Sequence, residues 1–139
     1  TEINVSEDAQ DVLNSESPYD FNIETNGTII PSFHRDNVWF TYDYKTPSSL
    51  AEESMNLDIF KVSREHDLIK FVVGSVEDLD CMRRMINQYP TKAQIYVSPV
   101  WGKIEAADII DYMKEHNLQN VRFQLQIHKF VWNPDAKGV

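Results

Sequence analysis

The clearest pattern in the chain is an alternation of apolar and polar residues near its C-terminus, in the run VRFQLQIH from Val121 to His128. One side of this run carries Val121, Phe123, Leu125 and Ile127, and the other carries Arg122, Gln124, Gln126 and His128. A period of two predicts a β-strand with one buried face. The polar side carries amides and an imidazole, which can donate and accept hydrogen bonds. It is therefore either a solvent-facing surface or a surface that binds a polar ligand.

The same reasoning predicts four more strands, with helical patterns between them. The predicted strands are 19–25, 37–45, 67–73 and 93–98, and the strongly apolar 67–73 should be central. Apolar residues at spacings of three and four predict helices over 76–89 and 104–115, and shorter helices are expected at 5–16 and 48–55, with 56–64 ambiguous. Strands that alternate with helices predict an α/β fold with a parallel sheet.

Local residues mark where these elements begin and end. Asn26-Gly27 predicts a turn after the first strand, and Asn117 is a plausible stop for the helix over 104–115. Ser75 is the expected N-cap of the helix over 76–89, and Asp78, three residues later, suggests a capping box. The apolar stripe of that helix is expected to comprise Val76, Leu79, Met82, Ile86 and Tyr89.

The polar sides of the strands become richer toward the C-terminal end of each strand. They offer Glu24 and Asn26, Asp43 and Lys45, Lys70, Tyr96 and Ser98, and Gln124, Gln126 and His128. The C-terminal ends of parallel strands meet at one edge of a sheet, so these groups should converge there. One-sided polar lining favours a partial (β/α) barrel, and an open sheet with a crevice at the same edge is the alternative.

Composition narrows the possible partners and compartments. The net charge of −9 argues against nucleic-acid binding, which needs clustered Lys and Arg. No stretch approaches the roughly 20 apolar residues of a membrane helix, and the acidic start TEINVSEDAQ is no signal peptide, so a cytoplasmic protein is predicted. The single cysteine, Cys81, excludes an intrachain disulfide, cannot alone hold zinc or an iron–sulfur cluster, and is expected in the core.

Pattern alone leaves the function open. The chain has none of the common phosphate, metalloprotease or nucleophile-elbow motifs. A lone His128 on the polar side is more often a hydrogen-bonded structural residue than a catalyst. Asp43 and Lys45 could form a salt bridge or clamp a zwitterionic ligand, and Ser98-Pro99 could simply end a strand. These residues indicate a polar ligand-binding edge.

Five stretches, in order, resemble the 7-carboxy-7-deazaguanine synthases, which are radical S-adenosylmethionine (SAM) enzymes of the queuosine and 7-deazapurine pathways. They are IETNGT (23–28), DYKTPSS (43–49), IKFVVGSVEDL (69–79), YVSPVWGKI (96–104) and VRFQLQIHKFVWNPDAKGV (121–139). The resemblance covers nearly the whole chain and includes a QxHKxxWxP tail. It implies a shortened barrel, a homodimer, use of Mg²⁺, and conversion of 6-carboxy-5,6,7,8-tetrahydropterin to 7-carboxy-7-deazaguanine.

The resemblance also implies roles for individual residues. Those that match the SAM-contacting segments are Asp43, Tyr44 and Lys45, then Ser98, Pro99, Val100 and Trp101, together with Glu24, Thr25 and Asn26 of the ETN stretch. Gln126, His128 and Pro134 match the region that closes over the pterin substrate. No residue is assigned a catalytic or metal-binding role, and Lys70 and His128 remain open between proton transfer, orientation of the substrate and packing.

The chain departs from the family at its start. The family holds its [4Fe–4S] cluster with a CxxxCxxC-type motif followed by a GGEP segment, and this chain, which begins at Thr1, contains neither. Residues 1–139 are therefore expected to form the C-terminal part of a radical SAM half-barrel domain that is inactive alone. Alternatives are another radical SAM activating enzyme, or a cluster-free α/β module that binds a ligand or a protein.

Overall fold

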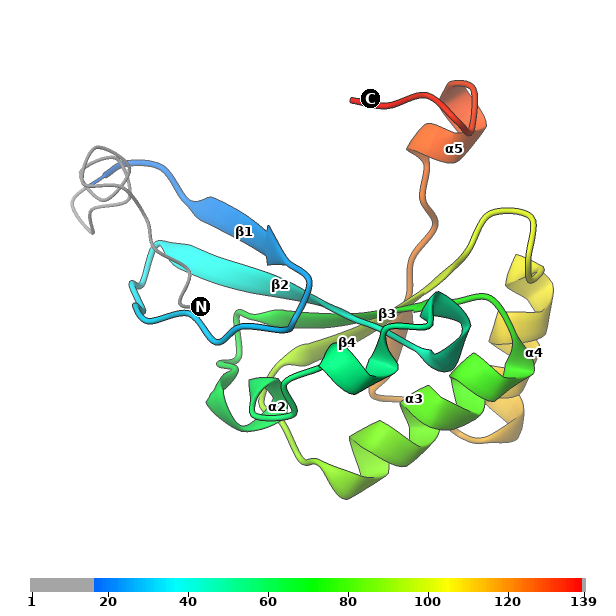
Figure 1. Cartoon of the computed structure of the whole chain (residues 1–139), viewed down its shortest axis with the longest axis horizontal. Helices are drawn as coiled ribbons and strands as arrows, with labels where there is room; N and C mark the ends of the chain where they lie inside the picture. Colours follow the sequence, from blue (N-terminus) through cyan, green and yellow to red (C-terminus); the bar gives the residue numbers. More distant parts are fainter. Residues whose placement is uncertain (1–16, 139) are drawn as a thin grey trace.

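The computed structural model describes residues 17–138 and contains a five-stranded parallel sheet in the order β1-β2-β3-β4-β5 (Figure 1). The strands are β1 (Phe21–Thr25), β2 (Val38–Tyr44), β3 (Leu68–Val73), β4 (Gln94–Pro99) and β5 (Val121–Phe123). The α-helices are α2 (Ile59–Val62), α3 (Val76–Gln88), α4 (Ala106–Glu115) and α5 (His128–Val131). The predicted α/β class, the parallel sheet and the central position of β3 are confirmed. The helix predicted over 5–16 lies outside the described residues.

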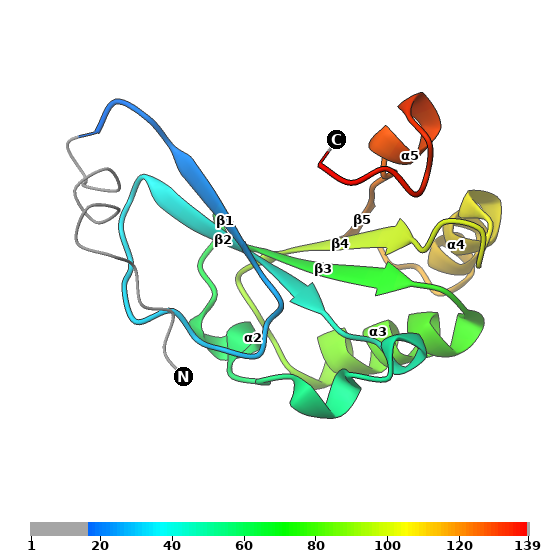
Figure 2. The same ribbon diagram turned by 45° about the horizontal axis from the view of Figure 1, so that its top comes forward.

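The order of the strands places the helices on one face of the sheet. Each crossover adds the next strand on the same side of the last, so right-handed crossovers put α3 and α4 on a common face. Figure 2 shows α2, α3 and α4 on that covered face, while α5 stands on the opposite, open side. A doubly wound sheet would instead reverse its strand order. The sheet is not closed, and this winding is compatible with part of a barrel.

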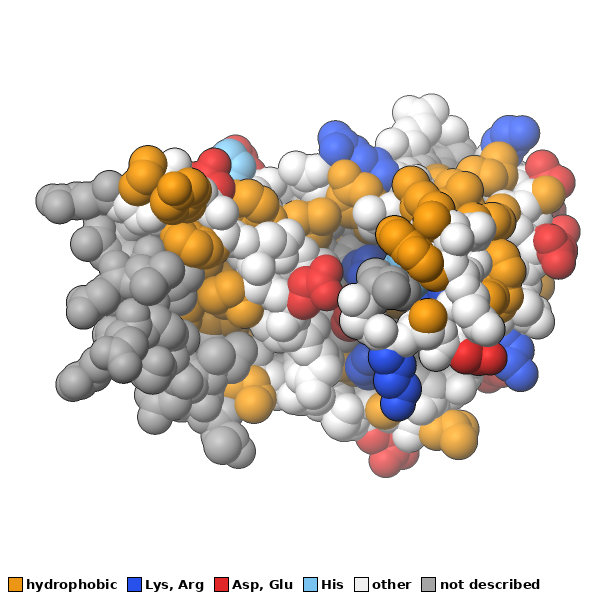
Figure 3. Space-filling model, turned by 90° about the horizontal axis from the view of Figure 1, so that it is seen from above, with side chains coloured by type: hydrophobic (Ala, Val, Ile, Leu, Met, Phe, Trp, Pro, Cys, Tyr) orange, Lys and Arg blue, Asp and Glu red, His pale blue; other side chains and the backbone are white. Residues whose placement is uncertain are grey.

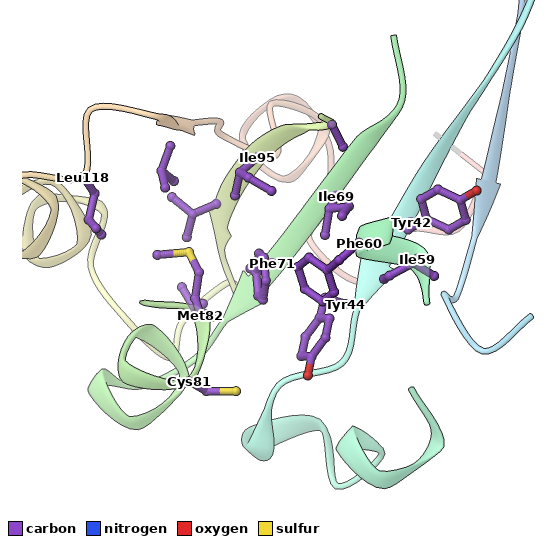
Figure 4. Packing of buried hydrophobic residues seen from close by; sticks show 14 of the residues in the cluster. Tyr42, Tyr44, Ile59, Phe60, Ile69, Phe71, Cys81, Met82, Ile95 and Leu118 are labelled. Atoms are coloured by element: carbon purple, nitrogen blue, oxygen red, sulfur yellow. The ribbon is translucent and has the colours of Figure 1, made fainter. Parts of the chain in front are cut away.

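The hydrophobic core lies between the covered face and its helices. Phe40, Tyr42 and Phe71 are fully buried, and the Tyr44 ring lies 4.7 Å from that of Phe71, centroid to centroid (Figure 4). Cys81 is buried beside these rings, as expected, and its thiol donates to Glu52 Oε1 at 3.2 Å. Burial, reinforced by Glu52, raises the pKa of Cys81 to about 12, so this thiol stays protonated at neutral pH.

Helix α3 begins where the sequence predicts. Ser75 Oγ accepts a hydrogen bond from the Asp78 N–H at 3.2 Å, which confirms the N-cap. Leu79 and Met82 are buried in the stripe, but Val76 is 58% exposed, so its expected place in the core is wrong. Val76 is the first residue of the helix, and the buried part of the stripe begins one turn later, at Leu79. Asn117, with φ of +54°, follows the end of α4 and confirms the predicted stop.

The predicted helix over 48–55 is wrong. The segment forms two 3₁₀ turns, η1 (Pro47–Ser49) and η2 (Glu52–Ser54). Leu50 lies between them with φ of +56°, a left-handed conformation that interrupts a helix. Residues 56–64, which the sequence left ambiguous, contain the short helix α2. Among residues 17–138, none of the helices combines the length and apolar character needed to cross a membrane.

The last strand is shorter than the alternation predicts. It ends at Phe123 and not at His128. In a parallel ladder, residue 99 of β4 would donate its N–H to the Gln124 carbonyl, but Pro99 has no N–H. The Gln124 N–H still donates to Val97 O at 2.9 Å, and the Ser98 hydroxyl donates to Gln124 O at 3.0 Å. The chain then leaves the sheet and forms α5.

Candidate functional site

A pocket of about 680 Å³ lies at the carboxyl ends of β2, β3 and β4. Its volume is within the range of small-molecule sites, and it occupies the edge where polar groups were expected to converge. The residues that line it are Asp43, Tyr44, Lys45, Thr46, Ser48, Ser49, Val72, Gly74, Val100, Lys103 and Gln126. The pocket therefore brings together residues from three strand ends and from the segment after β5.

Asp43 is the acidic side chain of this pocket and is paired across the sheet. It lies in register with Lys70 of β3, and the Lys70 ammonium lies 3.3 Å from Asp43 Oδ1. This oxygen is enclosed by protein and accepts no hydrogen bond, so the pair is held by charge alone. The Asp43 side chain is 31% exposed, which leaves the carboxylate accessible from the pocket. Asp43 can therefore accept hydrogen bonds from a ligand while Lys70 offsets its charge.

A polar row crosses the open face from this pair. The register of the sheet aligns Asp43, Lys70, Tyr96 and Arg122 on four neighbouring strands. Arg122 Nη1 donates to Gln94 Oε1 at 2.8 Å and to Tyr96 Oη at 3.3 Å. The Arg122 guanidinium lies 5.9 Å from the centre of the Tyr96 ring. The open face thus presents two cations and an aromatic ring.

The loop after β2 forms one wall of the pocket, and side chains fix it in place. Thr46 Oγ1 donates to Val72 O at 3.1 Å, which ties this loop to β3. The Ser48 N–H donates to Asp78 Oδ1 at 2.9 Å, which ties it to α3. Lys45 and Lys103 add two cations to the lining. In a chain of net charge −9, this local positive charge favours a ligand with an anionic group.

The residues at the end of β4 divide between the pocket and other surroundings. Val100 lines the pocket, whereas Ser98 is buried and donates its hydroxyl to Gln124 O. Trp101 is not among the lining residues, and its ring forms a T-shaped contact with that of Phe130, with centroids 4.7 Å apart. This aromatic contact joins the loop after β4 to α5.

The tail after β5 contributes one pocket residue, Gln126. His128 begins α5 and Pro134 accepts a hydrogen bond from Lys129 Nζ, and neither is among the lining residues. The large apolar side chains here stay exposed and form a patch visible over α5 in Figure 3. The residues of this tail patch are Trp101, Leu125, Ile127, Phe130, Val131 and Trp132.

Glu24 and Asn26 lie near the end of β1 and are not among the residues that line this pocket. Glu24 is exposed, on the same face of the sheet as Thr41, its register partner on β2. Asn26 Oδ1 accepts bonds from the N–H and hydroxyl of Thr28, and Gly27 has φ of +71°, which confirms the predicted turn. The Asn26 side chain is therefore already hydrogen-bonded within its own turn.

Curated relatives of known name match almost the whole chain. A 7-carboxy-7-deazaguanine synthase of Clostridium acetobutylicum is 40% identical over 92% of this chain, and one of Methanospirillum hungatei is 38% identical over 81%. A third, from Leptospira interrogans, is 31% identical over 84%. The chain is a homologue of the 7-carboxy-7-deazaguanine synthases. The resemblance read from the sequence is confirmed.

The match covers only part of each relative. The chain spans 60% of the Clostridium protein, 46% of the Methanospirillum protein and 50% of the Leptospira protein. No family model and no solved structure matches the chain. Its homology to 7-carboxy-7-deazaguanine synthases therefore rests on whole-sequence identity.

Several lining residues of this synthase homologue were not singled out from its sequence: Thr46, Ser48, Ser49, Val72, Gly74 and Lys103. All six lie within the stretches DYKTPSS, IKFVVGSVEDL and YVSPVWGKI that carry the resemblance. Their common signal is position, because each follows or ends a predicted strand. Binding residues are often placed at such strand ends, and backbone groups there need no characteristic side chain.

The residues present do not fit an iron–sulfur cluster. Such a cluster is held by several cysteine thiolates, and the whole sequence contains one cysteine, Cys81, whose thiol is buried and bonded to Glu52. Within residues 17–138, no three His, Cys, Asp or Glu side chains come together as a metal site. We therefore assign neither a cluster nor Mg²⁺ to residues of this chain.

Proposed function

We propose that this chain forms one wall of the SAM and substrate site of a 7-carboxy-7-deazaguanine synthase. The observation that carries the proposal is 40% identity over 133 residues to a protein of that name. The pocket at the carboxyl edge supports it, because it gathers the matching residues Asp43, Tyr44, Lys45 and Val100. The proposed enzyme converts 6-carboxy-5,6,7,8-tetrahydropterin to 7-carboxy-7-deazaguanine.

The pocket residues fit SAM by charge and shape. The ligand has a zwitterionic amino-acid end and a flat adenosine end, and the pocket offers Asp43, Lys45 and Lys103 beside the apolar walls of Val72 and Val100. When bound in a radical enzyme, SAM supplies the radical chemistry that a protein side chain cannot supply. The proposed work of this chain is to position the ligand and to exclude water from it.

The open-face row supports the proposed substrate class. A carboxylated pterin is flat and anionic, and Lys70, Tyr96 and Arg122 offer two cations and an aromatic ring in line with Asp43. A guanidinium binds carboxylates through paired N–H groups. Arg122 donates in this structure to neutral acceptors, so a carboxylate would be a stronger partner. Gln126 and His128 would contribute from the tail, as the resemblance implies.

The test is a direct assay of the whole protein encoded by the gene. The protein is reconstituted anaerobically with iron and sulfide and supplied with SAM, Mg²⁺, a reductant and 6-carboxy-5,6,7,8-tetrahydropterin. Product analysis by liquid chromatography and mass spectrometry should show 7-carboxy-7-deazaguanine, and omission of SAM should abolish it. Cleavage of SAM without this product would point to a different radical SAM activating enzyme. A protein without a cluster and without SAM cleavage would contradict the proposal.

A second candidate function is a cluster-free module that binds a nucleoside-like ligand. The observation that favours it is a formed pocket in a chain with a single cysteine. Isothermal titration of the isolated 139-residue chain with SAM distinguishes the two. Binding in the micromolar range without any cluster would support the module, whereas binding only in the reconstituted whole protein would support the enzyme.

A further inference from the structure

Asp78 holds together two loops that line the pocket although it is not itself a lining residue. It lies in the first turn of α3 and is fully buried. Its Oδ1 accepts the Ser48 N–H at 2.9 Å, and its Oδ2 accepts the Gly74 N–H at 2.7 Å. Ser48 belongs to the loop after β2, and Gly74 follows β3 directly. Each oxygen of one carboxylate therefore fixes one wall of the pocket.

The contacts around Asp78 extend to the loop after β4. A Cβ built on Gly74 would lie 3.5 Å from Lys103 Cβ and 3.6 Å from Val100 Cγ2, so this loop packs closely against Gly74. The Ser48 and Ser75 hydroxyl oxygens lie 3.3 Å apart, which adds a second link between the loop after β2 and α3. The position of Gly74 thus sets the spacing between the walls formed by Ser48 and by Val100.

The expected capping box is only half formed, and this difference shows the role of Asp78. The Asp78 N–H donates to Ser75 Oγ as a capping box requires. The carboxylate, however, accepts from Gly74 and from Ser48, thirty residues away in sequence. In a complete capping box the carboxylate would bond to the N–H of the N-cap residue and not to the loop after β2.

We propose that Asp78 is a positioning residue that sets the geometry of the pocket by holding the loops after β2 and β3. Hydrogen bonds to a carboxylate are stronger than those between neutral groups, and Ser48 and Gly74 would both lose such an acceptor. Loss of the carboxylate should therefore loosen residues 46–50 and 74–76 and weaken ligand binding without removing any group that touches the ligand. The ligand part of this proposal rests on the proposed function.

Asp67 provides a matched control at the other end of β3. It is also fully buried, and it accepts the N–H groups of Phe40 at 2.9 Å and Arg64 at 2.7 Å. It directly precedes β3, whereas Asp78 follows this strand, so the two carboxylates fix opposite ends of the same strand. Asp67→Asn and Asp78→Asn each replace a buried carboxylate by an amide. The first also weakens the ion pair with the Arg64 guanidinium, 3.3 Å away, but only the second lies beside the pocket.

The first measurement is amide hydrogen exchange in both variants. Asp78→Asn should lower protection of residues 46–50 and 74–76 by about tenfold or more beyond any global change, as expected for one lost charged hydrogen bond. In Asp67→Asn, protection of these residues should change only as much as the overall stability of that variant changes. Equal exchange of these loops in the two variants would overturn the proposal. This measurement needs no ligand, so it stands even if the proposed function fails.

The second measurement is steady-state kinetics of the reconstituted whole protein. Asp78→Asn should raise the KM for SAM by about tenfold with a smaller effect on kcat, and Asp67→Asn should leave this KM within about twofold. An unchanged KM in Asp78→Asn would contradict the proposal, while an inactive wild-type protein would overturn the proposed function instead. If Asp78→Asn does not fold, amide hydrogen exchange of Ser48 in the wild-type protein tests the proposal instead. Protection like that of β3 supports the proposal, and exchange at the rate of an unstructured peptide overturns it.

Discussion

The two faces of the sheet are built from the same strands but differ in what they contribute. On β3, Ile69, Phe71 and Val73 point toward the helices and are fully buried. Lys70, between them, points to the open face and pairs with Asp43. Burial of one large apolar side chain stabilises a fold by about 1.5–3 kcal/mol, whereas a partly exposed ion pair contributes about 0–1 kcal/mol. Most of the stability therefore comes from one face, and the proposed binding groups lie on the other.

The largest expected effect comes from the covered face. Phe71→Ala removes a fully buried ring that contacts the Tyr44 ring, and we expect it to lower the free energy of unfolding by about 3–5 kcal/mol. Urea denaturation followed by tryptophan fluorescence measures this change. A loss below about 1 kcal/mol would mean that the covered face is not the principal source of stability.

A smaller loss of stability is expected from the contact between β4 and the segment after β5. Ser98→Ala removes the hydroxyl that donates to Gln124 O in place of the missing amide of Pro99. We expect a loss of about 1–2 kcal/mol in the free energy of unfolding. Exchange of the Gln124 amide should also become faster, because its neighbouring carbonyl loses its partner. Unchanged exchange at this amide would contradict the explanation given for the end of β5.

Residues 121–128 show why the sequence predicts some elements and not others. The strand β3 and the start of α3 depend on patterns within their own segments, such as the run at 67–73 and Ser75, and both are confirmed. The end of β5 depends on Pro99 of a neighbouring strand, which the alternation at 121–128 cannot reveal. Local pattern therefore predicts the existence of elements better than their ends.

The same distinction applies to the candidate site. The expected convergence at the carboxyl edge follows from parallel strands, and Asp43, Lys45 and Gln126 do line one pocket. The sequence could not show that Ser98 is buried or that Asn26 bonds within its own turn. It also could not show the link between Ser48 and Asp78, because such contacts depend on how distant loops pack.

The buried Cys81 thiol on the covered face predicts that the free energy of unfolding depends on pH. The pKa of Cys81 rises from an ordinary value of 9.0 to about 12, chiefly through burial. Below pH 9 the Cys81 thiol is protonated in both the folded and the unfolded chain, so it does not make the free energy of unfolding depend on pH. Between pH 9 and 12 the unfolded chain ionises first, so stability should fall by about 1 kcal/mol per pH unit. Denaturation of the wild type and of Cys81→Ala across this window should show a shallower fall in the variant; parallel curves would contradict the assignment.

The smallest effect on stability is expected on the open face. Lys70→Met keeps the apolar stem but removes the ammonium that pairs with Asp43. We expect the free energy of unfolding to change by less than about 1 kcal/mol, in contrast with Phe71→Ala next to it. Under the proposed function, the same variant should raise the KM for the carboxylated substrate. A large loss of stability would remove the distinction between the faces.

The most direct test of the central claim compares two isosteric changes of a carboxylate in the reconstituted whole protein. Asp43→Asn alters the pocket, while Asp111→Asn makes the same change on the exposed surface of α4, where Asp111 lies 3.9 Å from Lys114. Under the proposed function, the quantity to measure is kcat/KM for SAM in the formation of 7-carboxy-7-deazaguanine. We expect a decrease of about tenfold or more for Asp43→Asn and a change within about twofold for Asp111→Asn. Equal values for the two variants would contradict a ligand site at the carboxyl edge of the sheet.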